Sequence, residues 1–350
     1  MRYGVADGRV VADVGGRVVA VGDVISDPVF EQPSLNAFMA QGPDAWRDTK
    51  TTVLGAQDPE KRDSARPERM GEMGMPFEVA DYVDFYSSIH HATNLGRLFR
   101  PDSEPLMPNW RHLPVGYHGR AGTVVVSGTP VVRPSGLVQT EGGVVRQPCA
   151  RLDIELEVGF VVGVGSERNA PIAVDDADKH VFGVVLVNDW SARDIQAFEY
   201  QPLGPNLGKS FLTSISPWVV PLDELRPFFR AAPQQTPPPD AGLRGTRDWA
   251  IDMHLEIERN GTVISETNFV DLYWTFAQQL AHMTSNGANV RTGDLFASGT
   301  VSGPEPGSYG SLIELGAGFL DDGDTIVLRG WCGDGDDRID LGDVVGTVKP

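Results

Sequence analysis

The sequence predicts a mainly β fold, with a small β module of its own in the first seventy or so residues. Forty glycines and 26 prolines divide the 350 residues into short segments, and most of these segments carry alternating β-branched residues, as strands do. Hydrophobic residues make up 41% of the chain, which is enough for one large domain or for a small domain joined to a larger one.

Four segments have the clearest strand signals because they are rich in valine, isoleucine and aromatic residues. They are residues 122–130, 152–164, 181–188 and 325–331. The second half of 152–164 is apolar on both faces, which is typical of a buried strand. An Asn-Gly pair at 260–261, between two alternating segments, predicts a tight hairpin.

Amphipathic helices are predicted in only two places. The first is residues 83–98, with Ser87 and Ser88 near its start, and the second is residues 271–285. Both show the apolar spacing and the polar starting residues of helices.

The charge of the chain argues against nucleic acid and membrane surfaces as partners, and its cysteine content argues against a disulfide framework. The formal net charge of -19 would repel nucleic acid and anionic lipid, so we expect neither as a partner. The two cysteines are too few for a disulfide framework, and the sequence shows neither a bilayer-spanning apolar run nor a secretory signal. A location in the reducing cytoplasm fits this composition, and an acidic substrate would need a local cluster of cations.

Three acids alternate with aliphatic residues along the predicted strand at 152–164. They are Asp153, Glu155 and Glu157, and alternation places them on one face of the strand. If that face is buried, the carboxylates need a cation to offset their repulsion. A metal site and a solvated acidic face are both compatible with the pattern.

Asp189 follows the apolar strand at 181–188, at a position where ligands commonly gather, although a helix cap would also explain an acid there. If Asp189 joins the glutamates, the ligand set is all oxygen. Such a set favours Ca²⁺ or Mg²⁺, with Mn²⁺ as a further option, over zinc.

His91 lies seven residues after Asp84, which is two turns along one face of the predicted helix. Tyr86 and Arg100 are close by in the sequence. A histidine, a phenol and a guanidinium are groups that bind and attack an anionic carbonyl compound. A histidine that merely satisfies the protein core is the simpler alternative.

Six segments of the chain resemble the fumarylacetoacetate hydrolase family. They run collinearly over roughly three quarters of the sequence, and they are residues 81–96, 106–130, 152–160, 188–211, 213–221 and 286–303. The resemblance implies a small N-terminal SH3-like β-barrel over 1–75, followed by a large C-terminal mixed β-roll domain over 76–350 that carries the catalytic site. It also implies a homodimer.

The resemblance assigns a role to each of fifteen positions. The implied ligands of a divalent metal are Asp84, Glu155, Glu157 and Asp189, and a second cation site would involve Asp189, Lys209 and Thr213. Leu212 stands there where the family usually has glycine, which puts the second site in doubt. His91 is the implied general base with Glu314 as its carboxylate partner; the other implied catalytic and substrate-binding residues are Arg193, Gln196, Lys209, Tyr86, Arg100, Tyr117, Tyr200 and Thr300.

The implied reaction is hydrolysis of a carbon–carbon bond in a β-diketo acid. For this family it would be cleavage of 4-fumarylacetoacetate to fumarate and acetoacetate, the last step of tyrosine and phenylalanine breakdown. An acylpyruvate hydrolase, a decarboxylase or an isomerase of the same superfamily is the nearest alternative. A non-catalytic, calcium-stabilised binding module is an alternative of another class.

Overall fold

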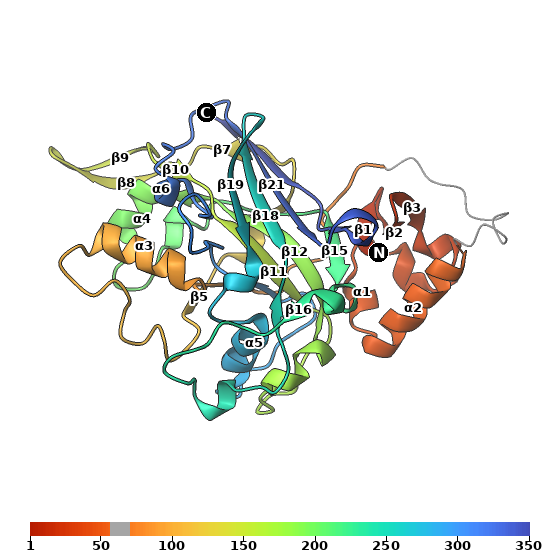
Figure 1. Cartoon of the computed structure of the whole chain (residues 1–350). Coiled ribbons are helices and arrows are strands. Elements are labelled where there is room, and N and C mark those ends of the chain that lie inside the picture. Colours follow the sequence, from red (N-terminus) through yellow and green to blue (C-terminus); the bar gives the residue numbers. More distant parts are fainter. Residues whose placement is uncertain (57–70) are drawn as a thin grey trace.

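A computed structural model describes residues 1–56 and 71–350, and it consists mainly of strands (Figure 1). The largest sheet in the described residues has eleven strands, of which nine follow one another in the order β3-β2-β1-β15-β12-β11-β20-β4-β5, while β14 pairs with β12 and with β6. Their bounds are β1 Arg2–Ala6, β2 Arg9–Val14, β3 Arg17–Ala20, β4 Tyr82–Phe85, β5 Gly116–His118, β6 Val124–Val126, β11 Leu156–Val162, β12 Val181–Asp189, β14 Thr213–Ile215, β15 Trp218–Pro221 and β20 Leu295–Ala297. The mainly β fold is confirmed.

A second sheet of six strands packs against the first across a shared hydrophobic core. Its order is β19-β18-β21-β23-β7, with β22 beside β21, and its bounds are β7 Val131–Val132, β18 His254–Arg259, β19 Thr262–Asn268, β21 Thr325–Cys332, β22 Ile339–Asp340 and β23 Val344–Lys349. Three further strand pairs join β8 Ser135–Thr140 to β9 Gly143–Pro148, β10 Leu152–Asp153 to β13 Ser191–Ala192, and β16 Phe229–Arg230 to β17 Ala250–Ile251. The hairpin expected at 260–261 joins β18 to β19, with both turn residues at positive φ.

The helices are few, and the first predicted one is partly wrong. Residues 82–85 form strand β4, which pairs with β20 and β5, and helix α3 begins only at Ile89, after Ser88. Ser88 caps it by accepting a hydrogen bond from the backbone N–H of His91 at 3.1 Å, as N-cap serines do. The helices are α1 Asn36–Met39, α2 Pro43–Ala56, α3 Ile89–Phe99, α4 Arg193–Glu199, α5 Phe276–Thr284 and α6 Leu312–Leu315.

Helix α5 is shorter than the expected 271–285. It starts at Phe276 because Thr275 and Gln278 form a capping box that fixes its first turn. Helix α2 was not expected from the sequence. In the described part of the chain, no helix combines the length and the apolar character needed to cross a membrane.

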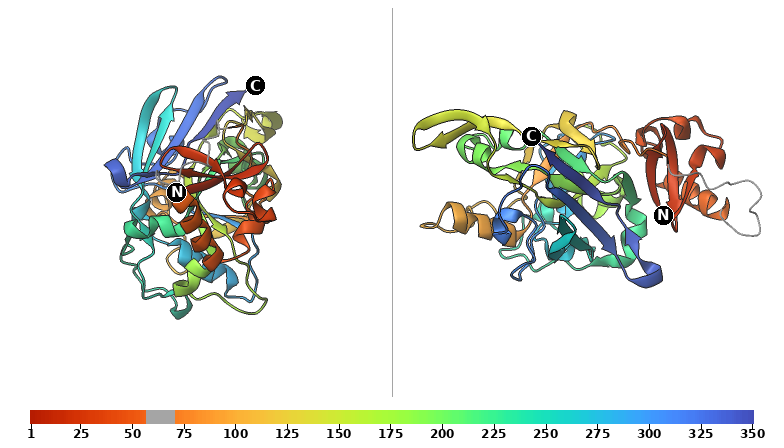
Figure 2. Two further views of the ribbon diagram at one scale, coloured as in Figure 1. Left: turned by 90° about the vertical axis from the view of Figure 1, so that its right-hand side faces the viewer. Right: turned by 90° about the horizontal axis from the view of Figure 1, so that it is seen from above.

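The N-terminal strands continue the large sheet. Strand β1 pairs antiparallel with β15, and the rings of Tyr3 and Phe38 pack against Phe182 of β12, with centroids 6.0 and 5.6 Å away. Figure 2 shows the N-terminal region at one end of the molecule. The division at residue 75 and the SH3-like barrel stay predictions.

The centre of the large sheet is where the candidate site is built. Strands β12, β11, β20 and β4 are neighbours in it. All residues of β11 and β12 are buried, so the side chains on these strands have little freedom to move. Polar side chains on these strands therefore need partners within the protein.

Candidate metal centre and active site

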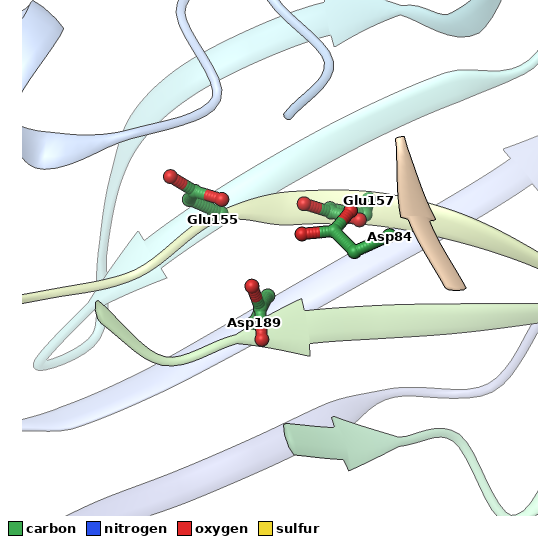
Figure 3. Close-up of side chains that lie close together, drawn as sticks. All are labelled: Asp84, Glu155, Glu157 and Asp189. Atoms are coloured by element: carbon green, nitrogen blue, oxygen red, sulfur yellow. The ribbon is translucent and has the colours of Figure 1, made fainter. Parts of the chain in front are cut away.

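Four buried carboxylates meet where strands β4, β11 and β12 come together (Figure 3). Each offers a ligand oxygen, and these atoms all lie within 4.8 Å of one another. Asp84 lies on β4, Glu157 on β11, Asp189 at the end of β12, and Glu155 directly before β11. The structure thus brings together the four residues that the resemblance implied as metal ligands.

The expected common face of Asp153, Glu155 and Glu157 is only partly correct. The strand is interrupted at residues 154–155, between β10 and β11, and the side chain of Asp153 turns to Arg193 instead of the cluster. All three acids are buried, with 0 to 5% of their surface exposed. A solvated acidic face is therefore wrong, because charged groups that face water remain exposed.

Two cations offset only part of this negative charge. The ammonium of Lys209 lies 2.5 Å from Glu155 and 2.8 Å from Asp189, and Arg193 lies 2.7 Å from Glu155. Burial raises the pKa of Glu155, but these two cations outweigh that effect and hold its pKa below the ordinary value. Burial lowers the pKa of Lys209, and Asp189 and Glu155 raise it above its ordinary value.

Asp84 and Glu157, the other half of the cluster, form no ion pair with any cation in the part of the chain that the structure describes. Burial, together with the negative charge of neighbouring carboxylates, raises the pKa of Asp84 and Glu157 well above the ordinary range. Asp84 Oδ1 and Glu157 Oε1 are buried and accept no hydrogen bond from any described residue. Oxygen-only ligands with unsatisfied buried acceptors fit a hard divalent cation such as Ca²⁺, Mg²⁺ or Mn²⁺.

Gly299 brings a backbone donor up to the cluster. Its N–H donates to Glu157 Oε2 at 3.1 Å. Its φ is +78°, and a Cβ at this position would lie 2.1 Å from the carbonyl oxygen of Phe85. Glycine is required here because the chain adopts a left-handed conformation in close contact with β4.

The expected second cation site has its three residues in contact with one another. Thr213 donates to Asp189 Oδ1 at 3.0 Å, while Lys209 donates to Asp189 Oδ2 at 2.8 Å, and Tyr117 donates to the same Oδ2 at 3.2 Å. Asp189 is thus part of the carboxylate cluster, and the helix-cap alternative is wrong. The second site, with Leu212 beside it, stays a prediction.

His91 forms a short pair with Glu314. The distance from His91 Nδ1 to Glu314 Oε2 is 2.6 Å, and both side chains are buried. The expected placement of His91 and Asp84 on one helix face is wrong, because Asp84 lies on β4 and His91 in the first turn of α3. The two residues nevertheless line the same cavity.

The hydrogen bonds around Glu314 fix the proton on the histidine ring. Burial raises the pKa of Glu314, but His91 and nearby hydrogen-bond donors lower it to about 2. The carboxylate is therefore ionised at neutral pH and accepts, so His91 Nδ1 donates to it. This leaves the lone pair of Nε2 as the basic position of the ring.

Asn94, Ser302 and Ser311 also hold Glu314, and sequence reasoning missed all three. Asn94 donates to Oε1 at 3.0 Å, and the two serines donate to Oε2 at 2.9 and 2.6 Å. Asn94 had a detectable signal, because it lies three residues after His91 on one helix face. The serines had none, since only tertiary folding brings residues 302 and 311 to His91.

A cavity of about 690 Å³ joins the carboxylate cluster to the histidine, a size typical of small-molecule sites. Its wall also has a large apolar part from α3 and from residues 105–115. Eleven of the fifteen positions singled out in the sequence line this cavity, namely Asp84, Tyr86, His91, Arg100, Tyr117, Glu155, Arg193, Gln196, Tyr200, Lys209 and Thr300. Of the remaining four, Asp189 contacts the lining residue Lys209, Glu314 contacts His91, Glu157 belongs to the cluster with Asp84 and Glu155, and Thr213 contacts Asp189.

Arg100 differs from the other two cations of the cavity. Arg193 and Lys209 are each paired with carboxylates. Arg100 donates to the carbonyl oxygen of Pro105 at 2.7 Å and has no ion pair with any residue of the described ranges 1–56 and 71–350. Its charge is therefore available to an anionic ligand.

The sequence matches one protein family over most of its length. The model of a family described as fumarylacetoacetate (FAA) hydrolase C-terminal matches residues 82–349. The fumarylacetoacetases of Bos taurus and Homo sapiens are each 44% identical to the chain, in alignments that cover 100% of this chain and 92% of theirs. The fumarylacetoacetase of Arabidopsis thaliana is 44% identical over 92% of this chain and 84% of its own.

Solved structures share the fold at low sequence identity. A fumarylacetoacetate hydrolase of Exiguobacterium antarcticum has a TM-score of 0.63 at 17% identity, covering 100% of this chain and 99% of its own. A maleylpyruvate hydrolase of Sphingobium sp. SYK-6, solved with manganese(II) and pyruvate, has a TM-score of 0.58 at 16% identity with the same coverage. At this identity the likeness shows the fold alone.

We expect divalent metal to stabilise the protein through the four carboxylates. A metal present at a hundred times its dissociation constant raises the free energy of unfolding by about 2.7 kcal/mol. Asp84→Asn should lose most of this gain, yet in chelator it should be at least as stable as wild type because it removes one buried acid. Thermal unfolding with EDTA, Ca²⁺, Mg²⁺ and Mn²⁺ measures both effects. Exposed Asp336 provides the control variant Asp336→Asn. If metal stabilised Asp84→Asn as much as it stabilises wild type, the proposed metal site would be wrong.

We expect the contribution of Glu314 to stability to depend on pH. Its pKa is about 2 in the folded protein and 4.5 ordinarily, so its stabilising effect is full above pH 4.5 and is lost as the pH falls towards 2. Glu314→Gln should cost about 3 kcal/mol of unfolding free energy near neutral pH, and less below pH ~4. Urea titrations of both proteins at several pH values measure this difference. A difference that does not vary with pH would show that Glu314 is not held as an ion.

Proposed function

The chain belongs to the fumarylacetoacetate hydrolase family, and we propose that it hydrolyses 4-fumarylacetoacetate to fumarate and acetoacetate. One observation carries this proposal: a buried four-carboxylate cluster and a histidine–glutamate pair open on the same cavity. A cation site alone would serve stability, and a histidine pair alone would serve many reactions. Together they provide what hydrolysis of a diketone needs.

The cavity suits an anionic diketo acid despite the net charge of the chain. The surface is strongly acidic, but Arg100, Arg193 and Lys209 all line the cavity. Arg100 has a free charge for the fumaryl carboxylate, and the hydroxyl groups of Tyr86 and Tyr200, which line the same cavity, can donate hydrogen bonds to the substrate. The apolar part of the wall excludes water from the carbon chain.

Asp84, Glu155, Glu157 and Asp189 would hold the divalent ion, and the ion would supply Lewis-acid polarisation of the two ketone oxygens. Glu155 and Asp84 line the cavity directly. Glu157 and Asp189 lie behind them. The chain's own groups then determine how the diketone is oriented and where protons move.

His91 acts as the general base. Glu314 holds its Nδ1–H, so Nε2 accepts a proton from a water molecule as the water oxygen bonds to the carbonyl carbon of the fumaryl group, the one attached to its double bond. The ketone oxygen gains the electron pair of its π bond and becomes an alkoxide. Arg193, Gln196 and Lys209 supply donors and positive charge for this oxygen, and one such donor typically contributes about 3 to 4 kcal/mol.

The carbon–carbon bond breaks when the alkoxide re-forms a carbonyl. The bonding electrons pass to the acetoacetate carbon as an enolate, which takes the proton that His91 removed from water. The other product is fumaric acid at its new carboxyl group, which releases the second proton of the water to solvent and becomes fumarate. Water is consumed, no electron leaves the reactants, and His91 returns to its starting form.

A non-catalytic binding module does not fit, because the histidine pair and the cations line a cavity beside the carboxylates. Acylpyruvate hydrolysis, decarboxylation or isomerisation stays the alternative reaction for the same site. The homodimer, the cytoplasmic location and the absence of nucleic-acid and membrane partners stay predictions.

We expect the purified protein to consume fumarylacetoacetate in the presence of divalent metal. Loss of substrate absorbance, with fumarate and acetoacetate identified by chromatography, measures the reaction. Acylpyruvates serve as competing substrates in parallel assays. Preference for an acylpyruvate by the metal-loaded protein would overturn the substrate assignment and would leave the metal site in place.

We expect His91→Gln to lower kcat by roughly 10²- to 10⁴-fold, because it removes the general base. Its stabilisation by metal should match that of wild type, since His91 is not a ligand. His90→Gln is the matched control, because His90 is adjacent in sequence and does not line the cavity. Steady-state kinetics of the three proteins would contradict the assignment if His91→Gln turned over like wild type.

A further inference from the structure

Asp153 is a fully buried acid that belongs neither to the carboxylate cluster nor to the histidine pair. None of its surface is exposed. Its Oδ1 accepts hydrogen bonds from the backbone N–H groups of Ile154 and Leu312, both at 2.8 Å. Its Oδ2 accepts from Arg193 Nε at 2.8 Å and from the N–H of Ile313 at 3.3 Å. Four donors from three segments thus converge on one carboxylate.

Two of these donors begin the helix that carries Glu314. The first N–H groups of a helix have no partner within it, and in α6 these are Leu312 and Ile313. Ser311, the N-cap residue, does not cap with its side chain, which instead donates to Glu314 at 2.6 Å. Asp153 therefore caps α6 from a separate strand and fixes the turn on which Glu314 lies.

The third segment carries Arg193, whose guanidinium is held from two sides. Asp153 binds Nε, and Nη1 lies 2.7 Å from Glu155 and donates to Gln196 at 3.2 Å. Nη2 is buried and has no hydrogen-bond partner among the described residues, while Arg193 lines the cavity. Because Asp153 and Glu155 hold the guanidinium from two sides, Nη2 is left to donate to an oxygen of the substrate.

We propose that Asp153 is a positioning residue that sets the distance between the oxyanion donor Arg193 and the base pair His91–Glu314. This inference rests on the proposed function, because it assigns Arg193 to the alkoxide and His91 to the water. The attacking water and the alkoxide oxygen are bonded to the same carbon in the transition state. Arg193 and the His91–Glu314 pair must therefore keep a fixed distance from each other. A misplacement of about 1 Å in such a site costs about 10²-fold in rate.

Asp153→Asn tests the link with little change in shape. Its amide oxygen can still accept from Leu312 and Ile154, but its NH₂ group faces Arg193 Nε, so two donors oppose each other. We expect kcat to fall about 10- to 100-fold with KM within about threefold of wild type, because Arg193 acts in the transition state. Stabilisation by metal should persist. A kcat equal to that of wild type would overturn the proposal.

A double-mutant cycle separates positioning from a purely structural role. Arg193→Lys keeps the charge and loses the Nε contact. If Asp153 acts through Arg193, Asp153→Asn should lower kcat by less than about threefold in the Arg193→Lys background. Losses that multiply would show independent effects and would overturn the proposal. Asp294→Asn is the matched control, because Asp294 is a buried aspartate that accepts a backbone N–H from Arg291 and does not line the cavity; its kcat should not change.

Hydrogen exchange tests the link from Arg193 through Asp153 to helix α6 without measuring catalysis. It can therefore test the proposal even if Asp153→Asn does not fold. In Arg193→Lys, Asp153 loses one of its anchors, so the amides of Leu312 and Ile313 should exchange about tenfold faster than in wild type. Unchanged exchange there would overturn the link. This readout needs no substrate, so failure of wild type to cleave fumarylacetoacetate would count against the proposed function and would leave the positioning role to be judged by exchange alone.

Discussion

Four carboxylates within 4.8 Å of one another in a buried site are the constraint on which the rest of the active site depends. Like charges at such separations in a low-dielectric interior repel strongly, and each must be offset by a cation, a donor or a proton. Lys209 and Arg193 offset one side of the cluster. The other side has unsatisfied oxygens on Asp84 and Glu157, and this is the reason that a divalent cation suits the site.

The same constraint explains why the ligands lie on or next to strands in the centre of the large sheet. Carboxylates that repel one another stay close only if the backbone that carries them is rigid. Strands β11 and β12 provide such a backbone, because they are buried along their whole lengths. The groups that handle substrate instead come from helices and loops around the cavity, including α3, α4 and α6. Glu314, which lies behind the cavity wall, is held by four hydrogen-bonding partners, namely His91, Asn94, Ser302 and Ser311.

The sequence was informative wherever chemistry lies in one contiguous segment. The strand alternation singled out Glu155 and Glu157, the end of an apolar strand singled out Asp189, and a seven-residue spacing singled out Asp84 and His91. The family resemblance then assigned each of them a role. The sequence misled where two kinds of structure meet within a few residues: the apolar spacing of 83–98 continues across the boundary at Ser88, although pairing with β20 and β5 makes its first part a strand. Ser302 and Ser311 could not be found, because no local pattern records a contact with Glu314 that depends on how distant segments fold together.

The net charge of -19 would repel an anionic substrate at long range. An enzyme with this charge therefore needs positive groups inside its cavity to attract such a substrate. At physiological ionic strength, screening confines the influence of exposed charges to about 8 Å, so most surface acids contribute little inside the cavity. Within it, Arg100 has no ion pair among the residues that the structure describes, whereas Arg193 and Lys209 are already bound to carboxylates. Direct contact with one unpaired guanidinium would therefore outweigh a distant, screened repulsion, and this is the physical basis for proposing Arg100 as the partner of the substrate carboxylate.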